Sequence, residues 1–265
     1  MKCCSPFPSR VPVSLRKNGA EWLWRAPRPA FWRASTDNDR GCSFPQRAAV
    51  WMGADVFVQR MGFTVQEKSA QCVRVQYRFG VPGVPGAQVE MIYTVEAQGA
   101  LRLDAVYHGV PGAPELPCFG IKFETAAPVV RTRWTGLSGE TYPDRCKGGV
   151  FGCHEEPPHI EPALVPQDCG LHMDTQQVNL QLADGKTLTL ESTGEAFAFS
   201  ALPNTAQQIE AAQHPCELPE TGRTCVTVLG AARGVGGIDS WGTDVEAPYH
   251  VNGEQQHSVS LRILL

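Results

Sequence analysis

The feature that most constrains the fold is a pair of short alternating segments joined by a tight turn. Residues 178–182 read VNLQL and residues 187–190 read TLTL, with Asp184-Gly185 between them. Apolar side chains at every second position place one face of a strand in the core. Asp-Gly supplies the positive φ angles of a type I′ turn. These residues predict an antiparallel β-hairpin.

The same pattern recurs along most of the chain, whose 26 Gly and 21 Pro suit many strands joined by turns. Further strands are predicted at 72–79, 89–95, 101–107, 226–229 and 259–264. Helical periodicity is weak, and the best short helices lie near 47–51 and 206–212. We therefore expect an all-β fold, a large antiparallel sandwich formed as one domain by residues 13–265.

Charge and hydropathy argue against two classes of partner. The formal net charge is -4 and no basic stretch is present, so we expect no nucleic-acid partner. No apolar run approaches the roughly 20 residues that cross a bilayer, so we expect no membrane span. The first residues lack the apolar stretch of a secretory signal, which favours a cytoplasmic protein. The ten cysteines form no C-x-x-C pair and are expected as free thiols.

Residues 153–159, which read CHEEPPH, invite a metal interpretation. The helical H-E-x-x-H motif needs both histidines on one helix face, and the two prolines prevent that arrangement. We expect a solvated loop here and no metal site.

Several sequence motifs carry more information than periodicity does. They read PAFWRASTDNDRG at 29–41, AVWMGAD at 49–55, WTGLSGETYPDR at 134–145, VPQDCG at 165–170 and GVGGIDSWG at 234–242. In this order they resemble the signatures of the β-galactosidase small chain, equivalent to the last domain of long glycoside hydrolase family 2 β-galactosidases. The resemblance covers residues 18–249. It implies a galactose-mutarotase-like supersandwich and a role in hydrolysing terminal β-galactosides such as lactose.

The resemblance also implies that Trp241 binds substrate, because the corresponding family tryptophan lines the sugar pocket. An indole offers an apolar platform to a sugar ring, and its N–H can still donate. Flanking glycines predict a projecting loop, with Asp239 and Ser240 as supporting turn residues; the alternative is a core tryptophan in a turn. Ile238 departs from the family's D-D-S-W pattern, which puts any polar contact at that position in doubt.

Residues 41–45 match the start of a family loop that moves over the active site when sugar binds. Glycine absorbs the backbone change of such a movement. Gly41 is the expected hinge and Ser43 the expected polar contact to the large chain. The alternative is an ordinary surface turn.

Asp37, Asn38 and Asp39 resemble a catalytic carboxylate pair, but we expect them to support a turn. Carboxylates only two residues apart need a special loop to reach the roughly 5 Å or 6.5–9.5 Å separation of glycosidases. Asp and Asn cap turns readily. Arg33 and Arg40 are expected to pair with these carboxylates or across an interface. Residues 142–145 predict a rigid turn with an Asp–Arg pair.

Nothing in the chain resembles the family's TIM-barrel domain or its catalytic glutamates. We therefore expect no catalytic residue and no cofactor on this chain. The expected partner is a large chain that carries the glutamates and most ligands of the family's Mg and Na or K ions. Two alternatives stay open. One is a stand-alone carbohydrate-binding or structural module; the other is a mutarotase-like isomerase using His172, His214 or His250 with a carboxylate.

The N-terminus departs from the family pattern. Small chains normally carry one or two strands before the segment that corresponds to 14–23 here. Residues 1–12 are rich in Pro and Cys and are expected to be irregular. The strand beginning near Val13 is expected at a sheet edge.

Overall fold

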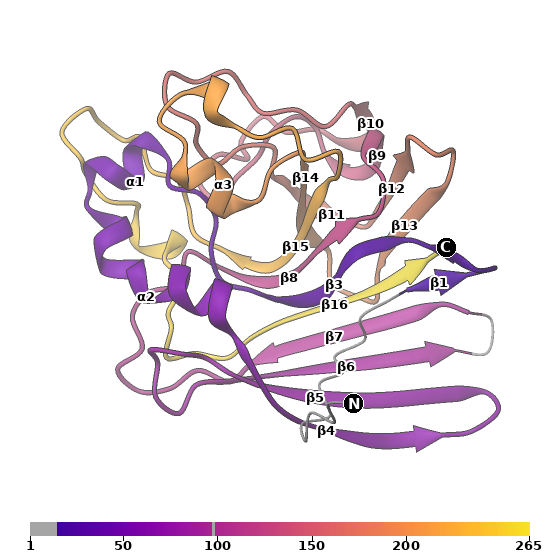
Figure 1. Cartoon of the computed structure of the whole chain (residues 1–265). Coiled ribbons are helices and arrows are strands. Elements are labelled where there is room, and N and C mark those ends of the chain that lie inside the picture. The colour runs from indigo at the N-terminus through magenta and orange to yellow at the C-terminus, as the bar shows by residue number, and fades with distance from the viewer. Residues whose placement is uncertain (1–14, 97–98) are drawn as a thin grey trace, which may run out of the picture.

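The fold consists of two antiparallel sheets packed face to face around a shared core (Figure 1). The structure is a computed structural model and describes residues 15–96 and 99–265. The all-β antiparallel sandwich expected from the sequence is confirmed. The expected irregular segment 1–12 and the strand start near Val13 lie outside the described residues.

The larger sheet has nine strands and the smaller has five. The nine-stranded order is β10 (Phe151–Glu156), β9 (Val129–Leu137), β12 (Gln177–Leu182), β13 (Thr187–Ser192), β16 (His257–Leu264), β7 (Leu101–Tyr107), β6 (Gln88–Glu96), β5 (Cys72–Gly80) and β4 (Gln59–Lys68). The five-stranded order is β11 (His172–Thr175), β14 (Phe197–Leu202), β15 (Cys225–Ala232), β8 (Cys118–Thr125) and β3 (Leu23–Ala30). A separate two-stranded hairpin joins β1 (Arg16–Lys17) to β2 (Ala20–Glu21).

Few helices interrupt the strands. They are α1 (Asp37–Gly41), α2 (Phe44–Phe57), α3 (Ala206–Ala211) and the 3₁₀ turns η1 (Pro215–Glu217) and η2 (Ala247–Tyr249). Both helix predictions are confirmed, although α2 is longer than the sequence suggested. Thr205 caps α3, because its side chain accepts from the backbone of Gln208, and the Gln208 side chain accepts in return from Thr205. In the described part of the chain, no helix is long and apolar enough to span a bilayer.

The predicted hairpin forms between β12 and β13, with Leu180 opposite Leu188 and both side chains fully buried. The predicted turn type is wrong. Gly185 has a φ of 86°, but Asp184 is outside the left-handed region, and its Oδ1 instead accepts from the Lys186 N–H at 3.2 Å. The positive φ pair of a type I′ turn occurs between β1 and β2, at Asn18 (53°) and Gly19 (80°).

Asp55 on α2 fixes this helix to the five-stranded sheet. Its side chain is fully buried, and Oδ1 accepts from the backbone N–H groups of Phe31 at 2.8 Å and Trp32 at 3.3 Å. Oδ2 accepts from Lys122 on β8 and from Gln207 on α3. A buried carboxylate is tolerated when its charge is paired and its oxygens are hydrogen-bonded. Asp55 therefore sets where α2, and the loop before it, lie on the sheet.

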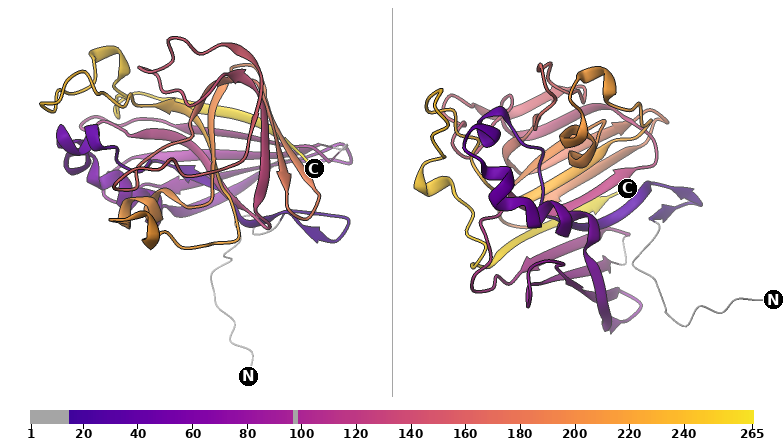
Figure 2. Two further views of the ribbon diagram at one scale, coloured as in Figure 1. Left: turned by 90° about the horizontal axis from the view of Figure 1, so that it is seen from above. Right: turned by 60° about the vertical axis from the view of Figure 1, so that its left-hand side comes forward.

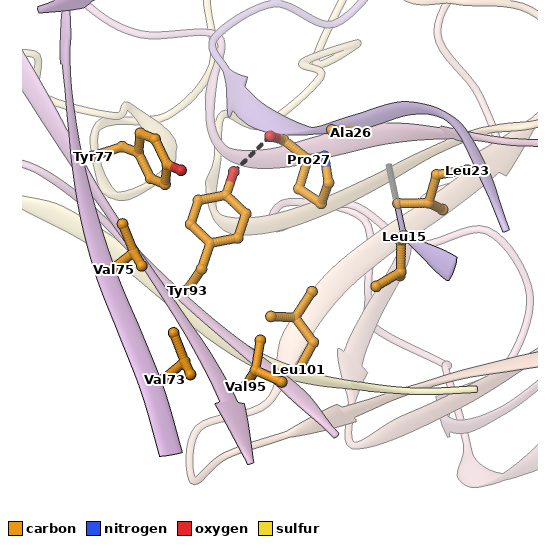
Figure 3. Close-up of a pocket in the computed structure, with 10 residues that line it drawn as sticks. All are labelled: Leu15, Leu23, Ala26, Pro27, Val73, Val75, Tyr77, Tyr93, Val95 and Leu101. Carbon is orange, nitrogen blue, oxygen red and sulfur yellow. Dashed lines mark hydrogen bonds between the residues drawn. The ribbon is translucent and has the colours of Figure 1, made fainter. Parts of the chain in front are cut away.

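An apolar groove of about 170 Å³ opens between β3 and strands β5, β6 and β7 (Figure 3). It is lined by Leu15, Leu23, Ala26, Pro27, Val73, Val75, Tyr77, Tyr93, Val95 and Leu101. The Tyr93 hydroxyl donates to the Pro27 carbonyl at 2.7 Å and joins the two sheets there. Next to the groove, β4 exposes Met61, Phe63 and Val65 by half or more. β3 is an edge strand, with β8 as its neighbour in the five-stranded sheet.

The prediction of a loop at residues 153–159 is wrong for residues 153–156. Residues 153–156 belong to β10, which pairs with β9 at the edge of the nine-stranded sheet. Residues 157–159 are irregular. Within 15–96 and 99–265, no group of three or more His, Cys, Asp or Glu side chains is placed to hold a metal ion.

Asp55→Ala should lower the free energy of unfolding by about 3–5 kcal/mol, because Lys122 would keep a buried charge without its partner. Urea unfolding followed by far-UV circular dichroism measures this loss. The matched control is Asp184→Ala, which removes a more exposed pair with Lys186 (2.7 Å) and should cost at most about 1 kcal/mol. Equal losses in the two variants would contradict the anchoring role of Asp55.

Candidate functional site

The candidate site is built on one buried carboxylate, Asp39, in helix α1. Its Oδ2 accepts from Arg33 at 2.6 Å and its Oδ1 from Arg233 at 3.1 Å. The three residues are 1%, 6% and 0% exposed. Burial alone would raise the pKa of Asp39, but the charge of Arg33 and hydrogen bonds from Arg33 and Thr36 lower it below its ordinary value. Asp39 is therefore held as a carboxylate.

Local hydrogen bonds place Asp39 and its neighbours in α1. Thr36 and Asp39 form a capping box: Thr36 N–H donates to Oδ2 at 2.9 Å, and Asp39 N–H donates to the Thr36 hydroxyl at 3.2 Å. Asp37 forms an exposed ion pair with Arg40 at 3.1 Å. Asn38 reaches away from the helix and donates through Nδ2 to a carbonyl of the 234–250 loop. The side chains of Asp37, Asn38 and Asp39 therefore stabilise helix α1 and its contact with the neighbouring loop.

The loop of residues 234–250, hereafter the Trp241 loop, lies beside α1 in both views of Figure 2. Its first end is held by the turn that contains Asp144 and Arg145. The Asp144 carboxylate accepts from the N–H groups of Val235 at 2.9 Å and Gly236 at 2.8 Å. Arg145 and Asn38 donate to the carbonyls of Gly236 and Val235 respectively. The predicted turn with Asp144 and Arg145 thus fixes the first end of the loop through hydrogen bonds.

The second end of the Trp241 loop is held by Asp244. Its carboxylate accepts from Arg233, from Arg47 on α2 at 2.6 Å and from the Val245 N–H at 2.9 Å. Burial alone would raise the pKa of Asp244. The hydrogen bonds from Arg47 and Val245 and the charge of Arg233 outweigh burial and lower the pKa to about 2.

Arg233 connects this second end to the rest of the protein. Glu115 accepts from Arg233 Nε at 2.6 Å and contacts His250 Nδ1 at 2.7 Å. The other ring nitrogen of His250 lies 3.1 Å from the Val245 carbonyl oxygen. The Arg233 guanidinium stacks on the Phe44 ring, with 3.8 Å from its carbon to the ring centroid. One fully buried cation is thereby compensated by three acidic side chains.

The middle of the loop projects from these anchors. Trp241 is 92% exposed, so the alternative of a core tryptophan is wrong. Asp239 shapes the turn beneath it by accepting from the Trp241 N–H at 2.9 Å and from the Thr243 hydroxyl at 2.6 Å. Hydrogen bonds from Thr243 and Trp241 lower the pKa of Asp239. Ser240 and Ile238 are both exposed on the same projection.

Gly41 lies against the Trp241 loop, and Ser43 follows it in the connection between α1 and α2. A Cβ built on Gly242, whose φ is 81°, would approach the Gly41 carbonyl oxygen to 2.5 Å, so the two backbones are in close contact. Gly41 ends α1. Ser43 is exposed, has a φ of 58° and precedes α2 without capping it through its side chain. The structure therefore brings together the two motifs that contain Gly41 and Trp241.

A polar pocket of about 500 Å³ opens beside the loop. It is lined by Pro143, Asp144, Arg145, Cys146, Lys147, Ile238, Glu246 and Tyr249. Ile238 links the pocket to the Trp241 loop, because it lines the pocket and precedes the exposed indole by three residues in the same loop.

Sequence reasoning missed the residues that anchor the second end of the Trp241 loop. Arg233, Asp244 and Glu115 belong to no motif that was singled out for a function. One signal was available: Arg233 directly follows the apolar strand β15, a position where a charged residue is unusual unless it is paired.

The three histidines considered for sugar isomerisation are placed differently. His172 is buried, its ring centroid lies 4.1 Å from that of Trp134, and its Nε2 lies 3.1 Å from Glu156. The cavity beside His172 measures about 10 Å³, enough for about one water molecule. His214 is exposed, and His250 belongs to the Arg233 cluster.

Asp244→Asn should make the stability of the chain less sensitive to acid. A carboxylate whose folded pKa is about 2, against an ordinary 3.8, contributes stability that is fully present above the ordinary value. That contribution is lost as the pH falls toward the folded pKa. The stability difference between the unmodified chain and the variant should be constant above about pH 5 and shrink between about pH 4 and pH 2. Urea unfolding at a series of pH values measures it, and a difference that stays constant to pH 2 would contradict this anchor.

Comparison with known proteins finds a family described as beta galactosidase small chain, which matches residues 11–263. The beta-galactosidase small subunit of Latilactobacillus sakei is 42% identical over 282 residues, covering 95% of this chain and 89% of that protein. The beta-galactosidase of Streptococcus thermophilus is 32% identical over 254 residues, covering 95% of this chain and 25% of that protein. Among solved structures, a galactose mutarotase-like protein from Lactobacillus casei ATCC 334 covers 93% of this chain and 90% of that chain, with a TM-score of 0.44 and 11% identity. The chain thus spans about a quarter of the length of the longer relative.

Proposed function

The chain belongs to the β-galactosidase small-chain family, and we propose that it completes the substrate pocket of a β-galactosidase whose catalytic glutamates lie on a separate, larger chain. The observation that carries this proposal is the 92% exposed Trp241 indole on a loop that is anchored at both ends. The relation to longer enzymes supports it, because the chain matches 25% of the Streptococcus thermophilus protein. A catalytic domain on another chain would supply the remainder.

Trp241 supplies a wall of the pocket. The apolar C–H face of a galactose ring packs on the indole, and the indole N–H stays available to a hydroxyl group. Because Asp144 and Asp244 fix the ends of the loop, little conformational freedom is lost when sugar binds. Asp239 and Ser240 shape the turn, and Asp239 holds the backbone at Trp241.

The connection between α1 and α2 forms the moving part of the proposed pocket. Gly41 is the hinge, and the exposed Ser43 hydroxyl contacts the larger chain when the segment closes. The close contact between Gly41 and Gly242 supports this proposal, because a backbone movement at Gly41 would displace the backbone at Gly242. Asp37, Asn38 and Asp39 keep the start of α1 in place during closure.

The remaining parts of the proposal concern the complex. The larger chain supplies the acid/base and nucleophilic glutamates, together with the ligands of Mg²⁺ and of Na⁺ or K⁺. The complex hydrolyses terminal β-galactosides such as lactose in the cytoplasm. Sugar isomerisation at His172 is not favoured, because this buried residue borders a cavity of only about 10 Å³, well below the volume of a ligand pocket.

The purified chain should not hydrolyse a chromogenic β-galactoside, because its partner holds the catalytic glutamates. Co-expression with a cognate large chain should give turnover on the order of 1–1000 per second. The large chain alone serves as the control and should be much less active. Turnover at such rates by the rigorously purified chain would refute the division of labour, and so would full activity of the large chain alone.

Trp241→Ala in the reconstituted complex should raise KM for galactosides by about 5- to 150-fold, the equivalent of about 1–3 kcal/mol for a lost stacking contact. The melting temperature should not change, because the side chain is exposed. Trp241→Phe is the matched control and should recover part of the loss. A variant that unfolds, or one that keeps the KM of the unmodified complex, would show that Trp241 does not contact substrate.

A further inference from the structure

A second exposed tryptophan, Trp24, lies at the other end of the five-stranded sheet. It is 57% exposed and belongs to β3. Strand β8 links the two regions: Cys118 at its start pairs with Ala232, just before the Trp241 loop, and Thr125 at its end pairs with Leu23. An eight-residue strand spans about 23 Å. The surroundings of Trp24 are therefore separate from the proposed substrate pocket.

Arg223 lies flat against Trp24. The carbon of its guanidinium group is 3.6 Å from the centroid of the indole ring, a close cation–π contact. Within the described residues 15–96 and 99–265, its guanidinium N–H groups donate to no protein acceptor. The stack holds a planar set of donors in place and leaves those donors available to a ligand.

Trp24 and Arg223 line a surface pocket of about 230 Å³ with other polar side chains. Glu124 on β8 is largely buried and pairs with Arg25 at 3.1 Å. Gln208 also lines the pocket and uses its Oε1 to cap α3, which leaves its amide N–H groups free of that bond. The pocket thus combines an aromatic platform, guanidinium and amide donors, and a carboxylate acceptor.

This combination fits a neutral sugar ring better than other small molecules. A pyranose has an apolar face for the indole, and its hydroxyl groups both donate and accept hydrogen bonds. Arg25 offsets the Glu124 charge. A phosphate ion has no apolar face for the indole, and a hydrocarbon would leave the donors unpaired. The volume of about 230 Å³ lies below the roughly 300–1,000 Å³ of drug-sized ligand sites, which favours a single ring.

We propose that the pocket of Trp24, Arg223, Glu124 and Gln208 binds one hexopyranose ring without catalysis. The ring packs on the part of the Trp24 indole that Arg223 leaves uncovered, neighbouring hydroxyl groups accept from Arg223 and Gln208, and a hydroxyl group donates to Glu124. Glu124 is the one carboxylate among the described lining residues, whereas glycoside hydrolysis needs two. The site retains sugar on the surface of the small chain, away from the Trp241 loop.

The test is a titration of the purified chain with methyl β-D-galactopyranoside, followed through the NMR signals of the indole N–H groups. The Trp24 signal, assigned by its absence from Trp24→Phe, should shift saturably. Arg223→Ala should weaken the sugar affinity by on the order of tenfold, and Arg223→Lys should weaken it too, because a lysine keeps the charge but lacks the planar donors. Trp241→Ala is the matched control and should leave the Trp24 shift unchanged. Melting temperatures check that each variant is folded.

Three results would overturn the proposal. They are a Trp24 signal that does not move, a sugar affinity that is the same in Arg223→Ala, and a Trp24 shift produced by inorganic phosphate but not by the sugar. The titration needs no large chain. A complex without β-galactosidase activity would therefore contradict the proposed function while leaving this site standing, and a failed titration would do the reverse.

Discussion

Two buried guanidinium groups, those of Arg33 and Arg233, meet at one buried carboxylate, Asp39, where helix α1 packs against the Trp241 loop. Burying these charges is unfavourable unless each is paired and hydrogen-bonded. Asp39 alone balances one of the two cations, and Asp244 and Glu115 supply the remaining negative charge around Arg233. Asp244 is part of both the Trp241 loop and this charge cluster, so it fixes the second end of the loop to the protein interior.

This charge cluster explains how an irregular loop holds an exposed indole in a defined place. Loops without regular hydrogen bonding usually belong to the least stable parts of a protein. Here Asp144 fixes the first end and Asp244 the second, so only residues 237–243, which include Trp241, lie between the two anchors. A platform fixed before sugar arrives costs less ordering entropy on binding. The same geometry keeps the α1–α2 connection in contact with the loop through Gly41 and Gly242.

The sequence predicted what local patterns determine. Alternation placed β12 and β13, and the flanking glycines of Trp241 predicted a projecting loop. The sequence did not predict features that depend on contacts between residues far apart in the chain. Residues 153–156 were expected in a loop because Pro157 and Pro158 rule out a helix there, yet pairing with β9 makes them an edge strand. Asp184 was expected in a type I′ turn, but it bonds to Lys186 instead. No local pattern shows that Arg233 meets Asp39, which lies 194 residues away in the sequence.

The central claim is that the Asp39 cluster serves substrate binding by holding Trp241 in place. The most direct measurement is a double-mutant cycle on KM in the reconstituted complex, with Asp39→Asn, Trp241→Ala and both changes together. If the cluster acts through Trp241, Asp39→Asn should raise KM in the unmodified complex and have little further effect once the indole is gone. Losses that add in full in the double variant would contradict the claim, because Asp39 would then act on the substrate independently of Trp241.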